Sequence, residues 1–521
     1  MNMYLIGIDV GSTTCKAALY DPSGRMISIA SREYEDLFFY PKPEWCEYDS
    51  EKLWKIVLLC IKESIQASKV NPIDIEALSV SVSGESIIPI GRDGRPSYNG
   101  INWTDKRDQS YKPQREKIDR EIGALRIYEI TGYPINPVPS LVKILWLKDE
   151  KTEAYNRTWK FMLWEDFINW KLTGKAILSY STASSSQMFD IRKKRWSTEI
   201  LETFDISPDI LSECLPSGSV IGNVLPEVSR ETGLSEETLV AAGGWDQSCG
   251  ALGAGALNEG EACNTTGTVE CITPVIRKPI LNEGTLSTGL YCSPYFNDDT
   301  YVFFAWFPTS GAILKWFRDN FADKEIELAN MSGRDAYDIL VELANQSKPG
   351  ASGLFLLPFF EGSGAGEPPT FNINARGAFI GLRLSHKKSD VVRSILEGVA
   401  FQTRVIIEKI EEIGIQIKEL KAIGGGAKSE FWMQIKADIT GKKVILPDVT
   451  EAGTLGAAIL ASVASRYHQD LTQAVKKMCR EKKVFYPQSE LTKTYEKIYN
   501  IYKSLYPSLL PIFNKMESLL Y

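Results

Sequence analysis

The chain has 521 residues, a formal net charge of −7 at pH 7 and 44% hydrophobic residues. This length is too great for one hydrophobic core, so we expect two large domains. The acidic balance argues against a general affinity for nucleic acid or for an anionic membrane. No stretch reaches the ~18 consecutive apolar residues of a membrane span, and the N-terminus lacks a signal-peptide pattern. Nine cysteines without CxxC spacing fit a reducing compartment, so we expect a cytoplasmic location.

The N-terminal stretch predicts a hairpin. The apolar run Met3–Asp9 ends at a carboxylate, the small-residue turn Gly11-Ser12-Thr13-Thr14 follows, and Cys15–Tyr20 is a second apolar run. Backbone N–H groups and hydroxyls gathered at such a turn suit a phosphate group. The alternative is an ordinary hairpin whose turn is capped by Asp9.

Two candidate pocket residues follow a predicted helix at Ser50–Lys69, for which Ser50 is the candidate N-cap. Glu85 comes just after the predicted strand Ala77–Ser83, and Trp103 lies in the predicted short strand Ile101–Asp105. Open α/β sheets place their substrate pockets at strand ends, so both residues are candidates. The alternatives are a turn carboxylate and a core indole.

The middle of the first half is less informative. Residues 120–170 have a helical pattern, interrupted by the Pro-rich loop Thr131–Pro139. The hydroxyl-rich run Ser179–Gln187 is compatible with a polyol pocket or with a surface loop.

The run Ala241–Gly255 is the strongest candidate for the chemistry. Asp246 stands between a strand of small residues and a Gly/Ala-rich segment, which allows close approach of a ligand to the backbone. With Trp245 before it and Gln247 after it, Asp246 offers a base beside an apolar wall and an amide. The alternative is a linker whose aspartate is merely solvated.

The second half repeats the first motif. Strand, turn and strand around Gly267 and Thr268 echo the layout around Asp9, which suggests a duplicated fold. Gly311 leads into a helix. Gly424-Gly425-Gly426 and Ser429 precede a predicted helix at Glu430–Thr440, an arrangement that lets a nucleotide lie near the helix N-terminus. It matches neither a Walker loop nor GxGxxG, which disfavours an NAD-dependent oxidoreductase.

Six segments together carry a family resemblance: IGIDVGSTTCKAALYD, GGWDQSCGALGAG, TTGTVE, NARGAFIGLRLSHKKSDVVRSILEGVAFQTR, GGGAKSEFWMQIKADITGKKV and EAGTLGAAILA. In this order and spacing the chain resembles the FGGY carbohydrate kinases, of the superfamily of actin, hexokinase and Hsp70-type ATPases. The resemblance implies an α/β fold of two ribonuclease-H-like (actin-like ATPase) domains with an interdomain cleft. We expect residues 1–252 to form the sugar-binding domain with the first phosphate hairpin, residues 253–465 the nucleotide-binding domain, and residues 466–521 a helical extension packed on the second domain.

The resemblance also implies residue roles. Asp246 matches the general base, and Asp9 the carboxylate that holds Mg²⁺. Glu85, Trp103, Asp246 and Gln247 match positions lining the substrate pocket. The positions matching nucleotide contacts are Gly11, Ser12, Thr13, Thr14, Lys16, Gly267, Thr268, Gly311, Gly425, Gly426 and Ser429.

The implied activity is transfer of the γ-phosphate of ATP to a hydroxyl of a neutral ketose or polyol, foremost a pentulose. Ribulose, fuculose and erythritol are alternative substrates, and a non-catalytic ATPase-fold sensor or switch is the alternative function. Gly84 and Val138 replace an Arg and a Tyr typical of glycerol kinases, which argues against glycerol. A carboxylate at Glu85 would repel a sugar acid. A homodimer is compatible with the sequence, which does not fix the oligomeric state.

Overall fold

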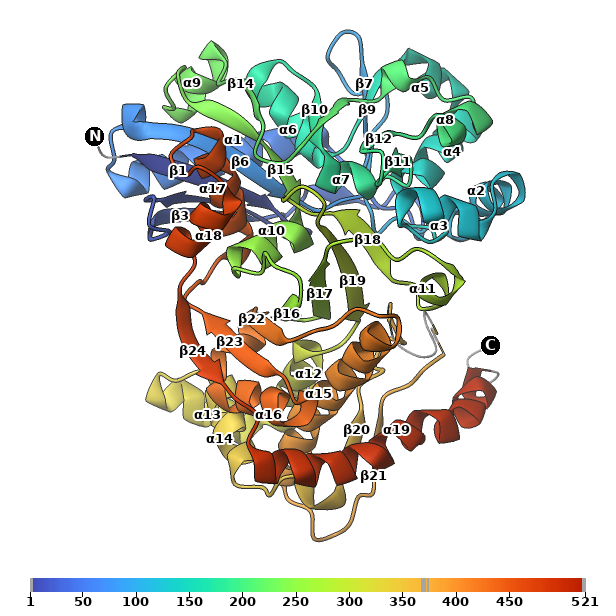
Figure 1. The fold of residues 1–521 in the computed structure, drawn as a ribbon, viewed down its shortest axis with the longest axis vertical. Helices are drawn as coiled ribbons and strands as arrows, with labels where there is room; N and C mark the ends of the chain where they lie inside the picture. The colour runs from blue at the N-terminus through green and yellow to red at the C-terminus, as the bar shows by residue number, and fades with distance from the viewer. Residues whose placement is uncertain (1–2, 367–371, 373, 518–521) are drawn as a thin grey trace.

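A computed structural model of the chain describes residues 3–366, 372 and 374–517. It folds into two lobes, each built on one mixed sheet (Figure 1). Helices form on both faces of each sheet because apolar side chains recur along them at helical spacing. In α1 (Ser50–Ser68), for example, Leu53, Val57 and Ile61 are buried on one face. The N-cap of α1 is Asp49, not Ser50 as predicted, since its carboxylate accepts from the backbone N–H groups at positions 51 and 52.

The first sheet has the strand order β14-β15-β6-β1-β2-β3. Strands β1 (Tyr4–Val10), β2 (Thr14–Tyr20) and β3 (Met26–Glu33) form an antiparallel meander. Strands β6 (Ile75–Val82) and β15 (Leu239–Trp245) continue the sheet parallel to β1, and β14 (Val220–Asn223) is an antiparallel edge. The predicted hairpin with its turn at residues 11–13 is therefore the centre of this sheet.

The second sheet has the order β18-β19-β17-β16-β22-β23-β24. Strands β16 (Glu261–Thr266), β17 (Glu270–Ile276) and β19 (Tyr301–Phe307) form the antiparallel part, and β22 (Glu419–Ile423) and β23 (Lys443–Pro447) run parallel to β16. An antiparallel edge strand, β24 (Glu481–Phe485), follows. The same topology thus occurs twice, which confirms the predicted duplication and two-domain α/β fold.

The other elements cover these sheets or extend the first lobe. In the first lobe they are β4 (Phe38–Phe39), β5 (Glu47–Tyr48), β7 (Ile88–Gly91), β8 (Gly100–Ile101), α2 (Arg107–Glu121), α3 (Ala124–Thr131), α4 (Ser140–Glu150), α5 (Thr152–Arg157), β9 (Thr158–Met162), α6 (Trp164–Thr173), β10 (Ile177–Ser179), α7 (Tyr180–Ser184), β11 (Phe189–Asp190), β12 (Arg195–Trp196), α8 (Thr198–Thr203), β13 (Glu213–Leu215), α9 (Pro226–Thr232) and α10 (Asp246–Gly253). After residue 276 they are α11 (Glu283–Ser287), β18 (Tyr291–Pro294), α12 (Gly311–Phe321), α13 (Asp323–Ser332), α14 (Ala336–Asn345), β20 (Phe355–Leu357), β21 (Ala378–Ile380), α15 (Lys388–Glu412), α16 (Glu430–Thr440), α17 (Ala452–Ala464), α18 (Leu471–Met478) and α19 (Ser489–Glu517).

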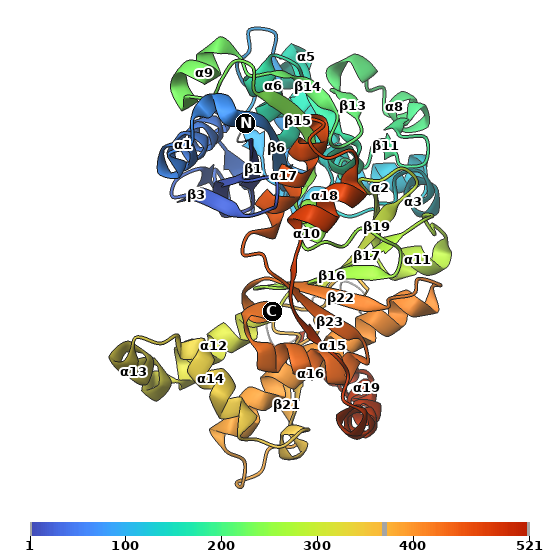
Figure 2. The ribbon, with the colours of Figure 1, turned by 60° about the vertical axis from the view of Figure 1, so that its left-hand side comes forward.

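Helix α17 lies within the predicted second domain by sequence, but it packs against β1, β6 and α10 of the first lobe (Figures 1 and 2). Small residues make this packing close: a Cβ on Gly7 would lie 1.7 Å from the carbonyl oxygen of Thr454, and one on Gly456 would lie 2.0 Å from that of Cys249. Apolar residues of α10, α17 and both sheets share one buried cluster. Helices α10 and α17 therefore form the layer between the sheets.

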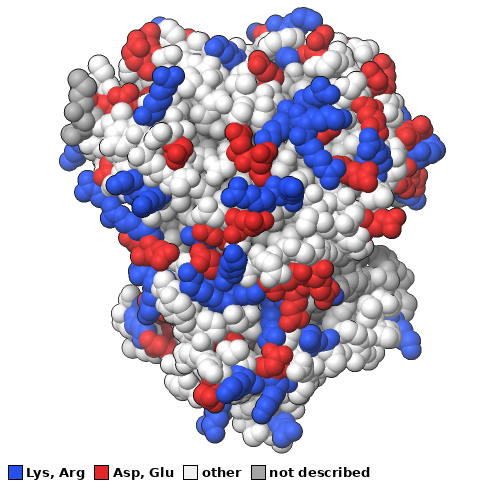
Figure 3. All heavy atoms as spheres, viewed as in Figure 1, with Lys and Arg blue, Asp and Glu red and all other residues white. Residues whose placement is uncertain are grey.

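The predicted extension after residue 465 divides between the lobes. Helix α18 packs on α17, β24 joins the second sheet, and α19 packs on α15 and α16. Within the described residues, no helix is long and apolar enough to cross a membrane. On the face shown in Figure 3, Lys and Arg side chains are interspersed with Asp and Glu.

Candidate active site

Asp246 begins α10 directly after β15, at the end of the sheet where the parallel strands terminate. A bulge in β15 makes this possible, because the pairing with β6 slips between Ala241 and Gly244. Gly243 in the bulge has to lack a Cβ, which would lie 1.7 Å from the carbonyl oxygen of Val80. The Asp246 carboxylate accepts from its neighbour's backbone N–H (Gln247, 2.7 Å).

Asp9 in β1 is electrostatically coupled to Asp246. Burial, and after it the nearby charge of Asp9, raise the pKa of Asp246 to about 7. Burial also raises the pKa of Asp9, while a hydrogen bond from Ser81 and the charge of Lys16 lower it. Two desolvated carboxylates of this kind favour a cation close by, and Mg²⁺ in kinase sites is bound by one or two carboxylates together with substrate phosphates. The donor set therefore fits Mg²⁺, although the described residues hold no cluster of three or more His, Cys, Asp or Glu side chains suited to a metal.

Serines on one face of β6 connect the predicted site residues. Ser81 Oγ donates to Asp9 at 2.6 Å, and Ser83 Oγ donates to Asp246 at 3.2 Å. Ser83 Oγ also lies 3.3 Å from the hydroxyl of Ser12 in the first hairpin turn. The sequence analysis did not identify Ser81 and Ser83 as site residues. Their alternation in the run SVSVS of an otherwise apolar strand was the available signal.

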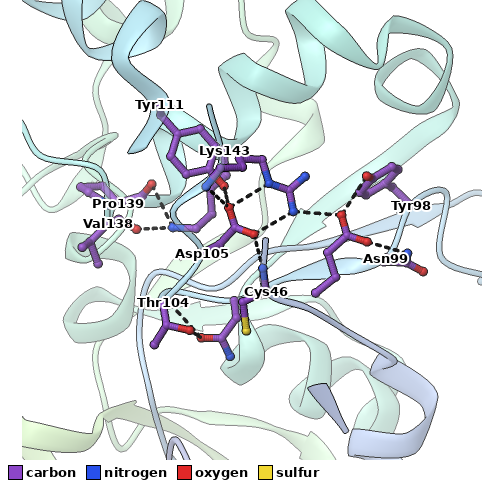
Figure 4. A network of polar contacts seen from close by, with 12 residues as sticks. Cys46, Tyr98, Asn99, Thr104, Asp105, Tyr111, Val138, Pro139 and Lys143 are labelled. Carbon is purple, nitrogen blue, oxygen red and sulfur yellow. Dashed lines mark hydrogen bonds and ion pairs between the residues drawn. The ribbon is translucent and has the colours of Figure 1, made fainter. Parts of the chain in front are cut away.

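Trp103 lies beside the same hairpin, since its indole Nε1 donates to Ser12 Oγ at 3.2 Å. A buried network behind it holds the segment in place (Figure 4). Asp105 accepts from Tyr111 at 2.6 Å and from Arg107, which also contacts Glu47 at 2.9 Å. The Arg107 guanidinium lies 4.0 and 4.4 Å from the ring centroids of two tryptophans, at positions 45 and 146. This network therefore gives Trp103 a buried support on the side away from its hydrogen bond to the first hairpin turn.

Glu85 is buried and has a φ of 62°, a region that a residue with a Cβ rarely adopts. Three segments fix it: its backbone N–H donates to Ser185, its carbonyl accepts from Ser140, and its Oε1 accepts from the Tyr133 hydroxyl at 2.9 Å. Burial raises the pKa of Glu85 to about 8, against the opposing effects of Tyr133 and Lys143. The hydroxyl-rich run at 179–187 is buried around this pocket and is not a surface loop.

Lys143 is a second residue that sequence reasoning missed. It lies in α4, is fully buried, and donates to the carbonyl oxygens of Val138 and Pro139 (Figure 4). It thereby fixes the Pro-rich loop that carries Tyr133. Burial lowers the pKa of this ammonium group, whereas the charge of Glu85 raises it. A lysine inside the apolar run SLVKILWL was the signal in the sequence.

Lys16 in β2 pairs with Glu451 at 2.7 Å, at the start of α17. Gly453, two residues further on, lies against Asp9: a Cβ there would be 2.8 Å from the Asp9 carboxyl carbon. The first hairpin and the interdomain helix α17 thus meet at the carboxylate, a contact that the sequence did not predict.

The predicted nucleotide positions of the second lobe converge. Gly311 N–H, at the start of α12, donates to the carbonyl oxygen of Gly267 at 2.8 Å, so α12 begins at the second hairpin turn. Thr268 in that turn is exposed. The glycine triplet lies against the same hairpin, because a Cβ on Gly426 would lie 2.4 Å from Thr266. Ser429 caps α16 by accepting from the backbone N–H of residue 432.

A cavity of about 770 Å³ joins the two groups of residues. Its wall includes Asp9, Lys16 and Arg25 from the first lobe, and Gly425 and Lys428 from the second. Of the predicted site residues, the structure therefore brings Asp9, Lys16 and Gly425 to the wall of one interdomain cleft. Glu85, Trp103 and Asp246 belong to the first lobe and are not among the described residues that line this cavity; Asp246 is linked to it through the charge of Asp9.

Comparisons with known proteins agree with this geometry. The model of the N-terminal domain of the FGGY family of carbohydrate kinases matches residues 4–253, and that of the C-terminal domain matches residues 262–465. The chain is 31% identical to a gluconokinase of Bacillus subtilis over 467 residues, 89% of this chain and 88% of that protein. It is 31% identical to a glycerol kinase of Thermococcus kodakarensis over 511 residues, 96% of each chain.

A solved structure of a ligand-bound xylulose kinase from Lactobacillus acidophilus superposes with a TM-score of 0.87, at 26% identity, over 99% of this chain and 100% of that one. The two family models together cover most of the sequence, and residues from both matched ranges line the cleft described above. The chain therefore belongs to the FGGY family of carbohydrate kinases and is an ATP-dependent sugar kinase.

Proposed function

We propose that the chain transfers the γ-phosphate of ATP to a hydroxyl group of a neutral ketose or polyol, with a pentulose as the first choice. The observation that carries this proposal is Asp246, a desolvated carboxylate with a pKa of about 7 that interacts electrostatically with Asp9, a residue of the cleft wall. A base with a pKa near the working pH is suited to take a proton from an alcohol.

In the proposed reaction the Asp246 carboxylate removes the proton of the sugar hydroxyl. The hydroxyl oxygen then bonds to the γ-phosphorus, the bond between that phosphorus and the bridging oxygen breaks, and ADP leaves. Glu85, Trp103 and Gln247 would hold the sugar. The two hairpin turns (Gly11 to Thr14, and Gly267 with Thr268) together with Lys16 would hold the phosphates.

The remaining proposed roles concern the nucleotide and the metal. Gly311, Gly425, Gly426 and Ser429 would contact the nucleotide, and Asp9 would hold Mg²⁺. When bound, Mg²⁺ offsets the charge of the triphosphate. The pairing of Lys16 with Glu451 supports a role for Lys16 at the phosphates, since it keeps an ammonium group at the edge of the cleft.

The similar proteins are named for different substrates, so we infer the class of sugar from the residues around Glu85. At Gly84 an added Cβ would lie 2.8 Å from Ser185 Oγ and 3.0 Å from Trp245 Nε1, so the arginine of glycerol kinases has no space here. This supports the argument against glycerol. The argument against a sugar acid is weaker than the sequence suggested, because burial raises the pKa of Glu85 and so disfavours its charged form.

The test is an ADP-release assay with wild type and Asp246→Asn over pentuloses, hexuloses, polyols, glycerol and gluconate. We expect a pentulose or a related neutral sugar to have the highest kcat/KM, and the variant to lose ~10²–10⁴-fold in kcat. Gluconate or glycerol as the best substrate would refute the proposed substrate class. A variant as fast as wild type would refute the role of Asp246.

A further inference from the structure

A buried ion pair lies beneath the second phosphate hairpin. Glu270, the first residue of β17, contacts Lys436 of α16, and both side chains are 0% exposed. Lys436 Nζ also donates to Asn264 Oδ1 at 2.9 Å and to Thr266 Oγ1 at 2.6 Å. Neither member of the pair has a role in the reaction proposed above.

The carboxylate of Glu270 collects contacts from further elements. It accepts from Ser310 Oγ at 2.7 Å, from Asn264 Nδ2 at 2.7 Å and from Thr403 Oγ1 at 3.3 Å. The pair therefore connects β16, β17, the residue before α12, the long helix α15 and α16. We call these five residues and Lys436 the Glu270 cluster (Asn264, Thr266, Glu270, Ser310, Thr403 and Lys436).

Three proposed nucleotide elements meet at this cluster. Ser310 directly precedes Gly311, whose N–H bonds to the second hairpin turn. Thr266, held by Lys436, is the residue against which Gly426 packs, and its carbonyl oxygen would lie 2.6 Å from a Cβ on Gly424. The hairpin turn, the start of α12 and the glycine triplet thus share one set of side-chain contacts.

An ion pair is a costly way to hold a core together. Desolvating two charges offsets most of their attraction, and apolar residues of similar size stabilise a core at least as well. What an ion pair adds is directional contact, because a carboxylate and an ammonium group fix several partners at once. Such a pair therefore fixes the positions of the surrounding elements in addition to any effect on stability.

We propose that Glu270 and Lys436 are positioning residues of the ATP site, which set the second phosphate hairpin, the start of α12 and the glycine triplet in register with one another. The inference rests on the proposed nucleotide site. It predicts that disturbing the pair impairs the use of ATP while leaving sugar binding in the other lobe intact.

The chain offers a matched control, the pair Arg393–Glu397 within α15. Glu397 is 2% exposed and accepts from Arg393 at 2.6 Å and from Tyr495 of α19 at 2.7 Å, partners that belong to none of the three proposed nucleotide elements. The experiment compares Glu270→Ala with Glu397→Ala, measuring KM for ATP, KM for the sugar, kcat and Tm. Ser310→Ala, which removes one contact of Glu270, serves as the milder variant should Glu270→Ala fail to fold.

We expect Glu270→Ala to lower kcat/KM for ATP by at least about tenfold, through a higher KM for ATP, a lower kcat or both. KM for the sugar should stay within about twofold of wild type. Ser310→Ala should shift the same two parameters in the same direction, by a smaller factor. Glu397→Ala should lower Tm comparably, with KM for ATP within about twofold of wild type.

Equal effects of Glu270→Ala and Glu397→Ala on ATP kinetics would overturn the inference, since the pair would then be only structural. So would an unchanged KM for ATP and kcat in Ser310→Ala when Glu270→Ala does not fold. A wild-type protein without sugar-dependent ADP release would instead refute the proposed function itself, so the two failures are distinguishable.

Discussion

The substitution Asp246→Asn tests the electrostatics of the cleft by stability as well as by activity. A pKa difference of one unit corresponds to 1.36 kcal/mol, so raising the Asp246 pKa from its usual 3.8 to about 7 costs at most about 4 kcal/mol of folding free energy above pH 7. The value is an upper bound because Asp246 is partly exposed. Asparagine removes this cost.

The direction in which stability changes with pH follows from proton binding. A carboxyl group whose pKa is raised on folding binds more protons in the folded state between about pH 4 and 7, so its contribution to stability falls as pH rises through that window. The Tm of Asp246→Asn minus that of wild type should therefore grow between pH 5.5 and pH 8.5. About 2 kcal/mol of the cost develops over that interval, which corresponds to about 2 °C in Tm if the whole chain unfolds as one unit and to about 4 °C if the first lobe unfolds alone.

The assay is thermal unfolding of both proteins without ligands at the two pH values, with ADP release measured in parallel. Asp298→Asn is the control, because this side chain is 98% exposed and a surface change of the same kind should shift Tm by only about 1 °C at either pH. A Tm difference that stays constant with pH would show that Asp246 is not a desolvated carboxylate. A more stable variant that keeps full activity would show that the desolvation has no catalytic use.

Three further predictions concern activity and packing. In wild type, kcat/KM for the sugar should fall about tenfold per unit below pH 7, because the base acts deprotonated, and a flat profile from pH 5.5 to 7.5 would contradict this. Gly84→Ala should lower the free energy of unfolding by about 1–3 kcal/mol and raise KM for the sugar, since the new methyl group meets Ser185 and Trp245. Denaturant unfolding and sugar kinetics measure the two effects, and values equal to those of wild type would refute the prediction. Gly456→Ala should lower the free energy of unfolding by at least about 3 kcal/mol, because its Cβ would lie 2.0 Å from a backbone carbonyl oxygen, and an unchanged unfolding midpoint would refute the close packing of α10 on α17.

Local patterns were sufficient for much of the fold. The helix predicted at Glu430–Thr440 has those bounds in the structure, and the two strand–turn–strand units form the centres of the two sheets. Their signals are short-range: glycines and hydroxyls at a turn, apolar alternation on either side, and a cap before a helix. Where the local pattern was ambiguous it failed, as at 158–162, predicted as helix but found as strand β9. Pairing with β7 decides that segment, and the pairing is not visible in the chain itself.

The sequence by itself determined the family, the duplicated α/β architecture and the identity of the residues proposed for the cleft, because turn chemistry, strand ends and helix starts are written in consecutive residues. Only the tertiary structure decided that α17 returns to the first lobe to lie against Asp9, that Lys143 holds the loop beside Glu85, and that Glu270 meets Lys436. Each of these depends on contacts between residues far apart in the chain. Burial, which raises the pKa of Asp246, arises in the same way, since the removal of water is a property of the assembled cleft and not of any local run of residues.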